Sequence, residues 1–158
     1  MGEEDRILAA MRRLTAAANK IDGAYYLCAK KMGIKENTLA LLYALDDGQP
    51  HTQKEIAETW LIPKTTINTA VKELMSAGYV TLAPASHTRE KTIVLTDAGR
   101  AYTTQMVGHI TTAERQALEE TLQRYSMDFI DAYDHFAQRL CQALRQKNSL
   151  GDDNERIV

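Results

Sequence analysis

The chain has 158 residues, of which 44% are hydrophobic and 25% are charged, as is usual for a globular protein with a buried core. Its apolar runs are short and broken by charges, so the composition excludes a membrane-spanning protein. A net charge of −2 gives no sign of nucleic-acid binding by itself, and two distant cysteines exclude a disulfide framework. The first residues lack the apolar stretch of a signal peptide, and we expect a cytoplasmic protein.

The first thirty residues predict one long amphipathic helix. Apolar residues recur there in alternating steps of four and three, at Ile7, Met11, Leu14, Ala18, Ile21, Tyr25, Cys28 and Met32. This spacing is an a/d seam over almost four heptads. Such a seam needs a partner helix, which comes either from the same chain or from a second subunit.

Three shorter helices are predicted next. The first covers residues 36–45, and a loop follows at residues 46–50. Thr52 and Glu55 have the spacing of a capping box, which begins the second of these helices. Pro63 occupies a first-turn position for a helix over residues 64–77, which Gly78 ends as a C′ glycine.

The apolar period then changes from that of a helix to that of a strand. Val80 and Leu82, and later Ile93 and Leu95, alternate with other residues around a polar tip, which predicts a β-hairpin. Residues 97–122 and 127–146 predict two further helices, and residues 148–158 predict a disordered tail.

The order helix, tight turn, helix, hairpin is that of a winged helix-turn-helix. The predicted fold class is therefore mainly α with a small β-hairpin wing. We expect a DNA-binding winged helix-turn-helix domain over residues 35–108. The helices at residues 1–34 and 109–147 are expected to form a dimerisation region.

The helix over residues 64–77 has two different faces. Ile67, Val71 and Leu74 share an apolar face, whereas the opposite face is polar and nearly free of acids. Short Thr and Asn side chains with Lys are suited to base edges and phosphates, and a basic hairpin tip is suited to a groove. We therefore predict double-stranded DNA as the partner, contacted by Thr52, Lys64, Thr65, Thr66, Asn68, Thr69, Lys72, His87, Arg89 and Lys91.

The run TQKEIAETWLIPKTTINTAVKELMSAGYV, followed by a hairpin and VLTDAGR, resembles the MarR family of bacterial transcription regulators. Leu95, Thr96 and Gly99 carry the family's Leu-Thr-x-x-Gly pattern. Three positions depart from the family: Leu61 stands where Gly is common in the turn, His87 where the wing often has Asp, and Thr69 where the recognition helix is often basic.

The resemblance implies a homodimer whose first and last helices interlock between subunits. It also implies a repressor of a pseudo-palindromic operator, released by a small aromatic or anionic effector that binds between the dimerisation and DNA-binding regions. The candidate effector-binding residues are Tyr25, Tyr26, Met32 and Tyr43.

Other chemistry finds less support in the sequence. The four histidines are scattered and no phosphate-binding glycine motif occurs, so we predict no enzyme, cofactor or metal site. Three alternatives stay open: a winged-helix module that docks proteins without DNA, a redox sensor that uses Cys28 or Cys141, and a metal sensor. The residues considered for the metal are Asp131, His135, Cys28 and His109.

Overall fold

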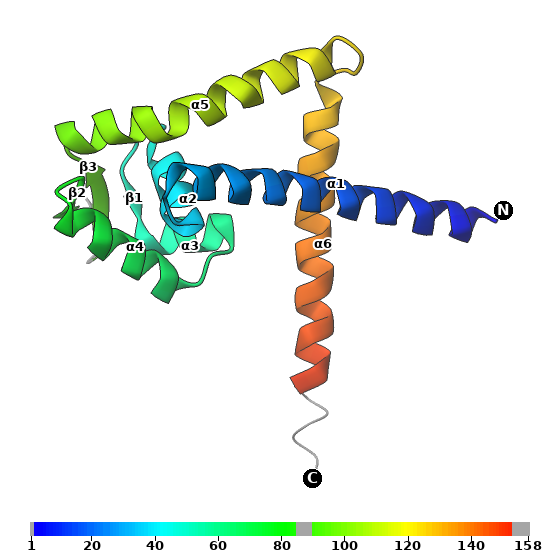
Figure 1. Cartoon of the computed structure of the whole chain (residues 1–158). Helices are drawn as coiled ribbons and strands as arrows, with labels where there is room; N and C mark the ends of the chain where they lie inside the picture. Colours follow the sequence, from blue (N-terminus) through cyan, green and yellow to red (C-terminus); the bar gives the residue numbers. More distant parts are fainter. Residues whose placement is uncertain (1, 85–89, 153–158) are drawn as a thin grey trace. The chain divides into compact units, whose positions relative to one another are not determined.

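The computed structural model describes residues 2–84 and 90–152, with side chains up to Lys147 (Figure 1). The elements in chain order are α1 (Glu3–Met32), α2 (Glu36–Leu45), β1 (His51–Thr52), α3 (Gln53–Trp60), α4 (Lys64–Ser76), β2 (Val80–Pro84), β3 (Lys91–Leu95), α5 (Asp97–Leu122) and α6 (Asp128–Asp152). The chain divides into two compact units, Met1–Thr111 and Thr112–Val158, so α5 belongs to both. The predicted class, mainly helical with a small β-hairpin, is confirmed.

The core of the first unit lies between its short helices and its sheet. Leu41 and Leu42 of α2, Ile67 of α4 and Ile93 of β3 are fully buried, and the end of α1 and Val107 of α5 pack against the same cluster. Burying one such side chain stabilises the fold by about 1.5–3 kcal/mol. The 3.6-residue spacing of apolar residues therefore fixes which side of α2 and of α4 faces inward.

The sheet is antiparallel, in the order β1–β3–β2. Val80 pairs with Leu95 and Leu82 with Ile93, which confirms the hairpin that their alternation predicts. The sequence did not predict β1, in which His51 pairs with Ile93 and Thr52 with Thr92. Two residues are too few to show a period of two, so this strand has no signal in the sequence.

Thr96 and Gly99 join the second strand of the hairpin to the end of α4. The Thr96 hydroxyl donates to the Gly78 carbonyl oxygen at 2.7 Å and accepts from the Gly99 N–H at 2.9 Å. A Cβ added at Gly99 would lie 1.8 Å from the Tyr79 carbonyl oxygen. The Leu-Thr-x-x-Gly pattern thus has a packing reason: the threonine caps α5, and the glycine lets α5 approach the backbone at Tyr79.

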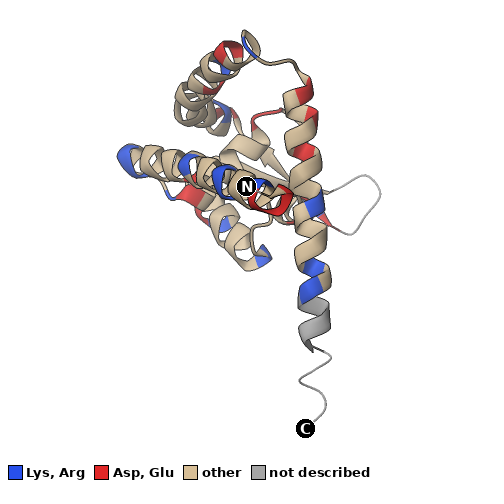
Figure 2. Cartoon of the chain, turned by 90° about the vertical axis from the view of Figure 1, so that its right-hand side faces the viewer, with Lys and Arg blue, Asp and Glu red and all other residues tan. Residues whose placement is uncertain are grey.

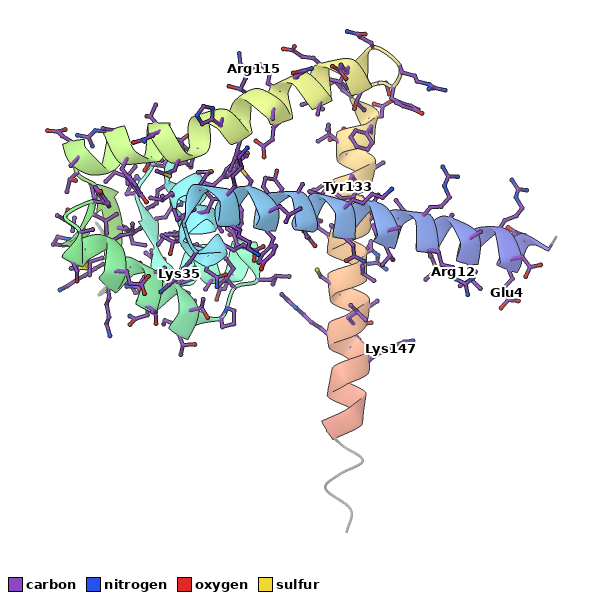
Figure 3. All side chains as sticks on the ribbon, in the orientation of Figure 1. Glu4, Arg12, Lys35, Arg115, Tyr133 and Lys147 are labelled. Atoms are coloured by element: carbon purple, nitrogen blue, oxygen red, sulfur yellow. The ribbon has the colours of Figure 1, made fainter. Side chains whose placement is uncertain are left out.

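The C-terminal part of the long helix α1 packs against the core of the first unit. Ala29 is buried and Tyr25, Cys28 and Met32 are half-buried against the core, whereas the seam closer to the N-terminus is exposed. Its exposed apolar residues are Ile7, Met11, Leu14 and Ile21. Glu4 and Arg12 mark this exposed part in Figure 3, and its acidic first turn is red beside the N-terminus in Figure 2.

The second unit contains the end of α5, a short turn and α6. The apolar face of α6 is exposed within this unit, through Phe129, Ile130, Tyr133, Phe136, Leu140 and Leu144. The sequence predicted that this helix ends near Gln146 and that residues 148–158 form a tail. The helix instead continues to Asp152, because no proline follows Gln146 to end it; residues 153–158 lie outside the described residues.

The proposed division into a DNA-binding domain over residues 35–108 and a dimerisation region from residues 1–34 and 109–147 stays a prediction. Across residues 2–84 and 90–152, no helix is long and apolar enough to cross a membrane.

The close approach at Gly99 gives a test of this packing. Gly99→Ala should destabilise the protein by about 1–3 kcal/mol or more, because the new methyl group meets backbone that must shift. Gly108→Ala, in the same helix, is the control, since a Cβ there meets nothing within 4 Å. This control should raise stability by about 0.5–1 kcal/mol, because alanine favours a helix interior. Urea unfolding of the two variants measures both effects, and equal midpoints would contradict the packing.

Candidate nucleic-acid interface

The interface is built on α4, which has one buried and one exposed side. Ile67, Ala70, Val71 and Leu74 are buried, so the opposite side faces solvent. Thr65, Thr69, Lys72 and Ser76 are exposed on that side, as the sequence predicted from the helical spacing. Two of the hydroxyls donate to the backbone one turn earlier, from Thr69 to the Thr65 oxygen and from Ser76 to the Lys72 oxygen. Each still has an oxygen that can accept a hydrogen bond from a ligand.

Asn68 is held in place by a neighbouring helix. Its side-chain amide nitrogen donates to the Gln53 Oε1 atom at 3.2 Å, and the residue is half-buried. Gln53 is the first residue of α3, so the bond joins α3 to α4. One amide hydrogen and the carbonyl oxygen of Asn68 lie outside this bond, and an amide carries a donor and an acceptor side by side. No pattern in the sequence indicates this contact between residues fifteen positions apart.

The two lysines of α4 are exposed, whereas its one acid lies in an ion pair. Lys64 and Lys72 are exposed, and the single acid of the helix, Glu73, forms an ion pair with Lys35 at 2.5 Å. Lys35, labelled in Figure 3, precedes α2 and comes from outside the helix-turn-helix. An exposed ion pair contributes little to stability. Its consequence is electrostatic, because it neutralises the one carboxylate that would repel phosphates from α4.

Two further residues predicted to contact DNA, Thr52 and Thr66, are not fully exposed. Thr52 is buried, and its hydroxyl accepts from the Glu55 N–H at 3.1 Å, which confirms the capping box. Thr66 is half-buried and lines a small cavity beside Lys35 and Glu73. The Thr52 hydroxyl takes part in the cap of α3, and the contact of Thr52 and Thr66 with DNA stays a prediction.

The wing supplies one predicted contact within the described residues. Lys91 begins β3 and is exposed. His87 and Arg89 lie outside the described residues, so their role at the tip stays a prediction.

The turn between α3 and α4 has an unusual residue at its centre. Leu61 has φ 51° and ψ 36°, the left-handed conformation that favours glycine, and its side chain is exposed. This is one of the positions at which the sequence differs from the family that it resembles, where glycine is common. Trp60, just before it, is also partly exposed and meets Tyr43 edge to face, with ring centroids 5.7 Å apart.

A pocket of about 370 Å³ lies beside this turn. Two of the four residues predicted to bind an effector, Tyr25 and Tyr43, line it; Tyr26 and Met32 do not. Tyr26 is exposed, and Met32 accepts a hydrogen bond from the Cys28 thiol at 3.5 Å. Sequence reasoning missed Asp22, Glu36 and Trp60, which also line the pocket, because three different helices bring them together.

The residues considered for redox and metal chemistry are placed as follows. Cys28 and Cys141 are half-buried free thiols, one in each unit. Within residues 2–84 and 90–152, no group of three or more His, Cys, Asp or Glu side chains has an arrangement that could hold a metal ion.

Comparison with known proteins identifies this fold. Residues 32–90 match the model of the MarR family, and no curated protein sequence matches the chain. The transcriptional regulator BldR from Sulfolobus solfataricus is similar in structure, with a TM-score of 0.66, 17% identity and coverage of 88% of this chain and 99% of that one. NMB1585, a MarR family regulator from Neisseria meningitidis, has a TM-score of 0.64, 19% identity and coverage of 94% and 98%. The transcription regulator MarR from Oenococcus oeni has a TM-score of 0.66, 13% identity and coverage of 84% and 98%.

The cap at the start of α3 makes the stability of the protein depend on pH. The Thr52 N–H donates to the Glu55 carboxylate at 2.7 Å, and this bond holds the pKa of Glu55 below its ordinary value of 4.5. A lowered pKa adds stability above pH 4.5 that is lost as the pH falls through the folded-state pKa. The free-energy difference between wild type and Glu55→Gln should therefore be constant above about pH 5.5 and shrink below it.

Urea unfolding at a series of pH values measures this difference. Thr52→Ala should cost about 1 kcal/mol, while Thr52→Ser keeps the hydroxyl and serves as its control. A difference between wild type and Glu55→Gln that does not vary with pH would show that the carboxylate takes no part in the cap.

Proposed function

Because residues 32–90 carry the MarR-family winged helix-turn-helix, and the chain has the fold of that family's transcription regulators, we propose that it represses transcription as a homodimer. Each subunit inserts α4 into the major groove at one half of a pseudo-palindromic DNA site. The wing lies along the neighbouring backbone. A small molecule in the pocket beside the turn releases the DNA.

The observation that carries the proposal is the exposed side of α4. It presents hydroxyl, amide and ammonium groups, and its one acid is neutralised by Lys35. Side chains of this kind recognise base edges and phosphates. Asn68 is the residue best suited to read a base, because Gln53 holds its amide in one orientation before DNA arrives.

A winged helix that docks proteins would expose large apolar side chains on this helix instead. Within α4, all of which is described, one large apolar side chain is exposed, Met75. Interfaces between proteins are rich in aromatic and large apolar anchors, and a single methionine provides little of that surface. The composition of α4 therefore favours nucleic acid as the partner.

The dimer is proposed from the exposed seam of α1 and the exposed apolar face of α6. Ile7, Met11, Leu14 and Ile21 are each between 39% and 57% exposed in the single chain. A series of large apolar side chains at heptad spacing is a surface that a second helix covers. A second copy of the chain offers the same series, as a two-fold dimer requires.

The DNA-binding proposal predicts different effects for two neighbouring positions. Asn68→Ala should lose about 1–3 kcal/mol of preference at one base pair of each half-site and leave binding to random duplex unchanged. Lys72→Ala should weaken binding to all duplexes and lower the slope of log affinity against log salt by about one unit. Selection from a random DNA pool, followed by anisotropy titrations at several salt concentrations, measures both.

Met75→Ala is the control, because it changes an exposed side chain of α4 that cannot form a polar contact with a base. If the wild type enriches no inverted repeat, specific DNA binding by α4 is wrong. If Asn68→Ala enriches the same repeat as strongly as the wild type, the base-reading role of Asn68 is wrong.

The dimer proposal predicts that charges in the seam separate the subunits. Leu14→Asp with Ile21→Asp should shift a micromolar sample from dimer to monomer, because burying two carboxylates of each helix in the proposed interface costs several kcal/mol. Ala16→Asp with Asn19→Asp places the same charges on the other side of α1 and should leave the dimer intact. Sedimentation equilibrium measures the mass, and a folded wild-type monomer at that concentration would exclude the dimer.

A further inference from the structure

The pocket beside the helix-turn-helix has an aromatic wall. Tyr25 from α1, Tyr43 from α2 and Trp60 from the end of α3 all line it. The rings of Tyr43 and Trp60 meet at 68°, so together they form a corner. Its volume of about 370 Å³ is in the range of pockets that hold a small organic molecule. Aromatic side chains whose faces surround a pocket bind organic cations, because the ring faces are electron-rich.

The charged groups of the same pocket are both acidic. Asp22 and Glu36 line it, and the other residues that line it are Asn37, the three aromatic residues and aliphatic side chains. Among the described residues that line the pocket, none is basic. Two carboxylates that line one pocket raise the local concentration of cations and repel an anionic ligand.

One feature of the pocket acts in the opposite direction. Glu36 and Asn37 belong to the first turn of α2, and the N-terminus of a helix carries a partial positive charge of roughly one half. That partial charge favours an anion. Glu36 lies in the same turn with a full negative charge, and Asp22 adds another, so the net charge around the pocket is negative.

We propose that this pocket binds an aromatic or other hydrophobic organic cation, such as a quaternary ammonium compound, and discriminates against aromatic anions. The aromatic corner holds the cationic head, and Asp22 and Glu36 supply the opposite charge. This inference names the chemical class of the effector in the proposed function and rests on it for the regulatory consequence. The binding preference itself is tested without DNA.

The chain contains one tryptophan, Trp60, so its fluorescence reports directly on the pocket. The full-length protein is titrated with benzyltrimethylammonium, with its uncharged isostere neopentylbenzene, and with benzoate. Benzyltrimethylammonium should bind at least about tenfold more tightly than either of the other two, because only it has both the ring and the positive charge.

The carboxylates are tested by Asp22→Asn with Glu36→Gln, which should reduce the preference for the cation at least about fivefold. Both residues are exposed, so the fold should tolerate the change, and circular dichroism checks this. Glu3→Gln with Glu4→Gln changes the net charge equally at the start of α1 and should leave the preference intact. Trp60→Leu, followed by calorimetry, should weaken binding of the cation more than binding of neopentylbenzene.

Benzoate binding as tight as the cation, or no binding of the cation up to millimolar concentration, overturns the proposal. A preference that survives Asp22→Asn with Glu36→Gln also overturns it. DNA affinity, measured separately with and without the cation, distinguishes the two levels of inference. Cation binding that leaves DNA affinity unchanged supports the ligand class and overturns the release mechanism of the proposed function.

Discussion

Burial of one side of α4 is the constraint on which the rest of the first unit depends. Ile67, Val71 and Leu74 are almost fully removed from solvent, and each contributes about 1.5–3 kcal/mol when buried. No rotation of the helix keeps these three residues inside and changes which residues lie outside. The same hydrophobic contacts that stabilise the fold therefore determine the row of Thr, Asn and Lys side chains that is presented to a ligand.

Most of the fold could be predicted from the sequence, because its signals are local. The capping box at Thr52, the glycine after α4 and the alternation in the hairpin each depend on residues a few positions apart, and the structure confirms each of them. The exposed polar side of α4 follows from helical spacing in the same way. The resemblance to the MarR family identified Thr96 and Gly99 as part of a pattern, which the spacing of residues alone does not do.

The parts that could not be predicted depend on contacts between distant segments. Gln53 and Asn68 are both polar, and nothing in their spacing indicates that one holds the other. The ion pair between Lys35 and Glu73 joins residues thirty-eight positions apart. The order of helices was enough to place Tyr25 and Tyr43 near each other, and both line the pocket, but the charge of that pocket required the packed structure.

The two-residue strand β1 has a mechanical consequence. Thr52 pairs with Thr92 of the wing and also caps α3, and the next residue, Gln53, holds Asn68 of α4. The base of the wing, the first turn of α3 and the middle of α4 are thus linked through two consecutive residues. A wing immobilised on a phosphate backbone would limit the freedom of Asn68 through these linked residues. Binding of the DNA backbone by the wing and recognition of bases by α4 would then be coupled.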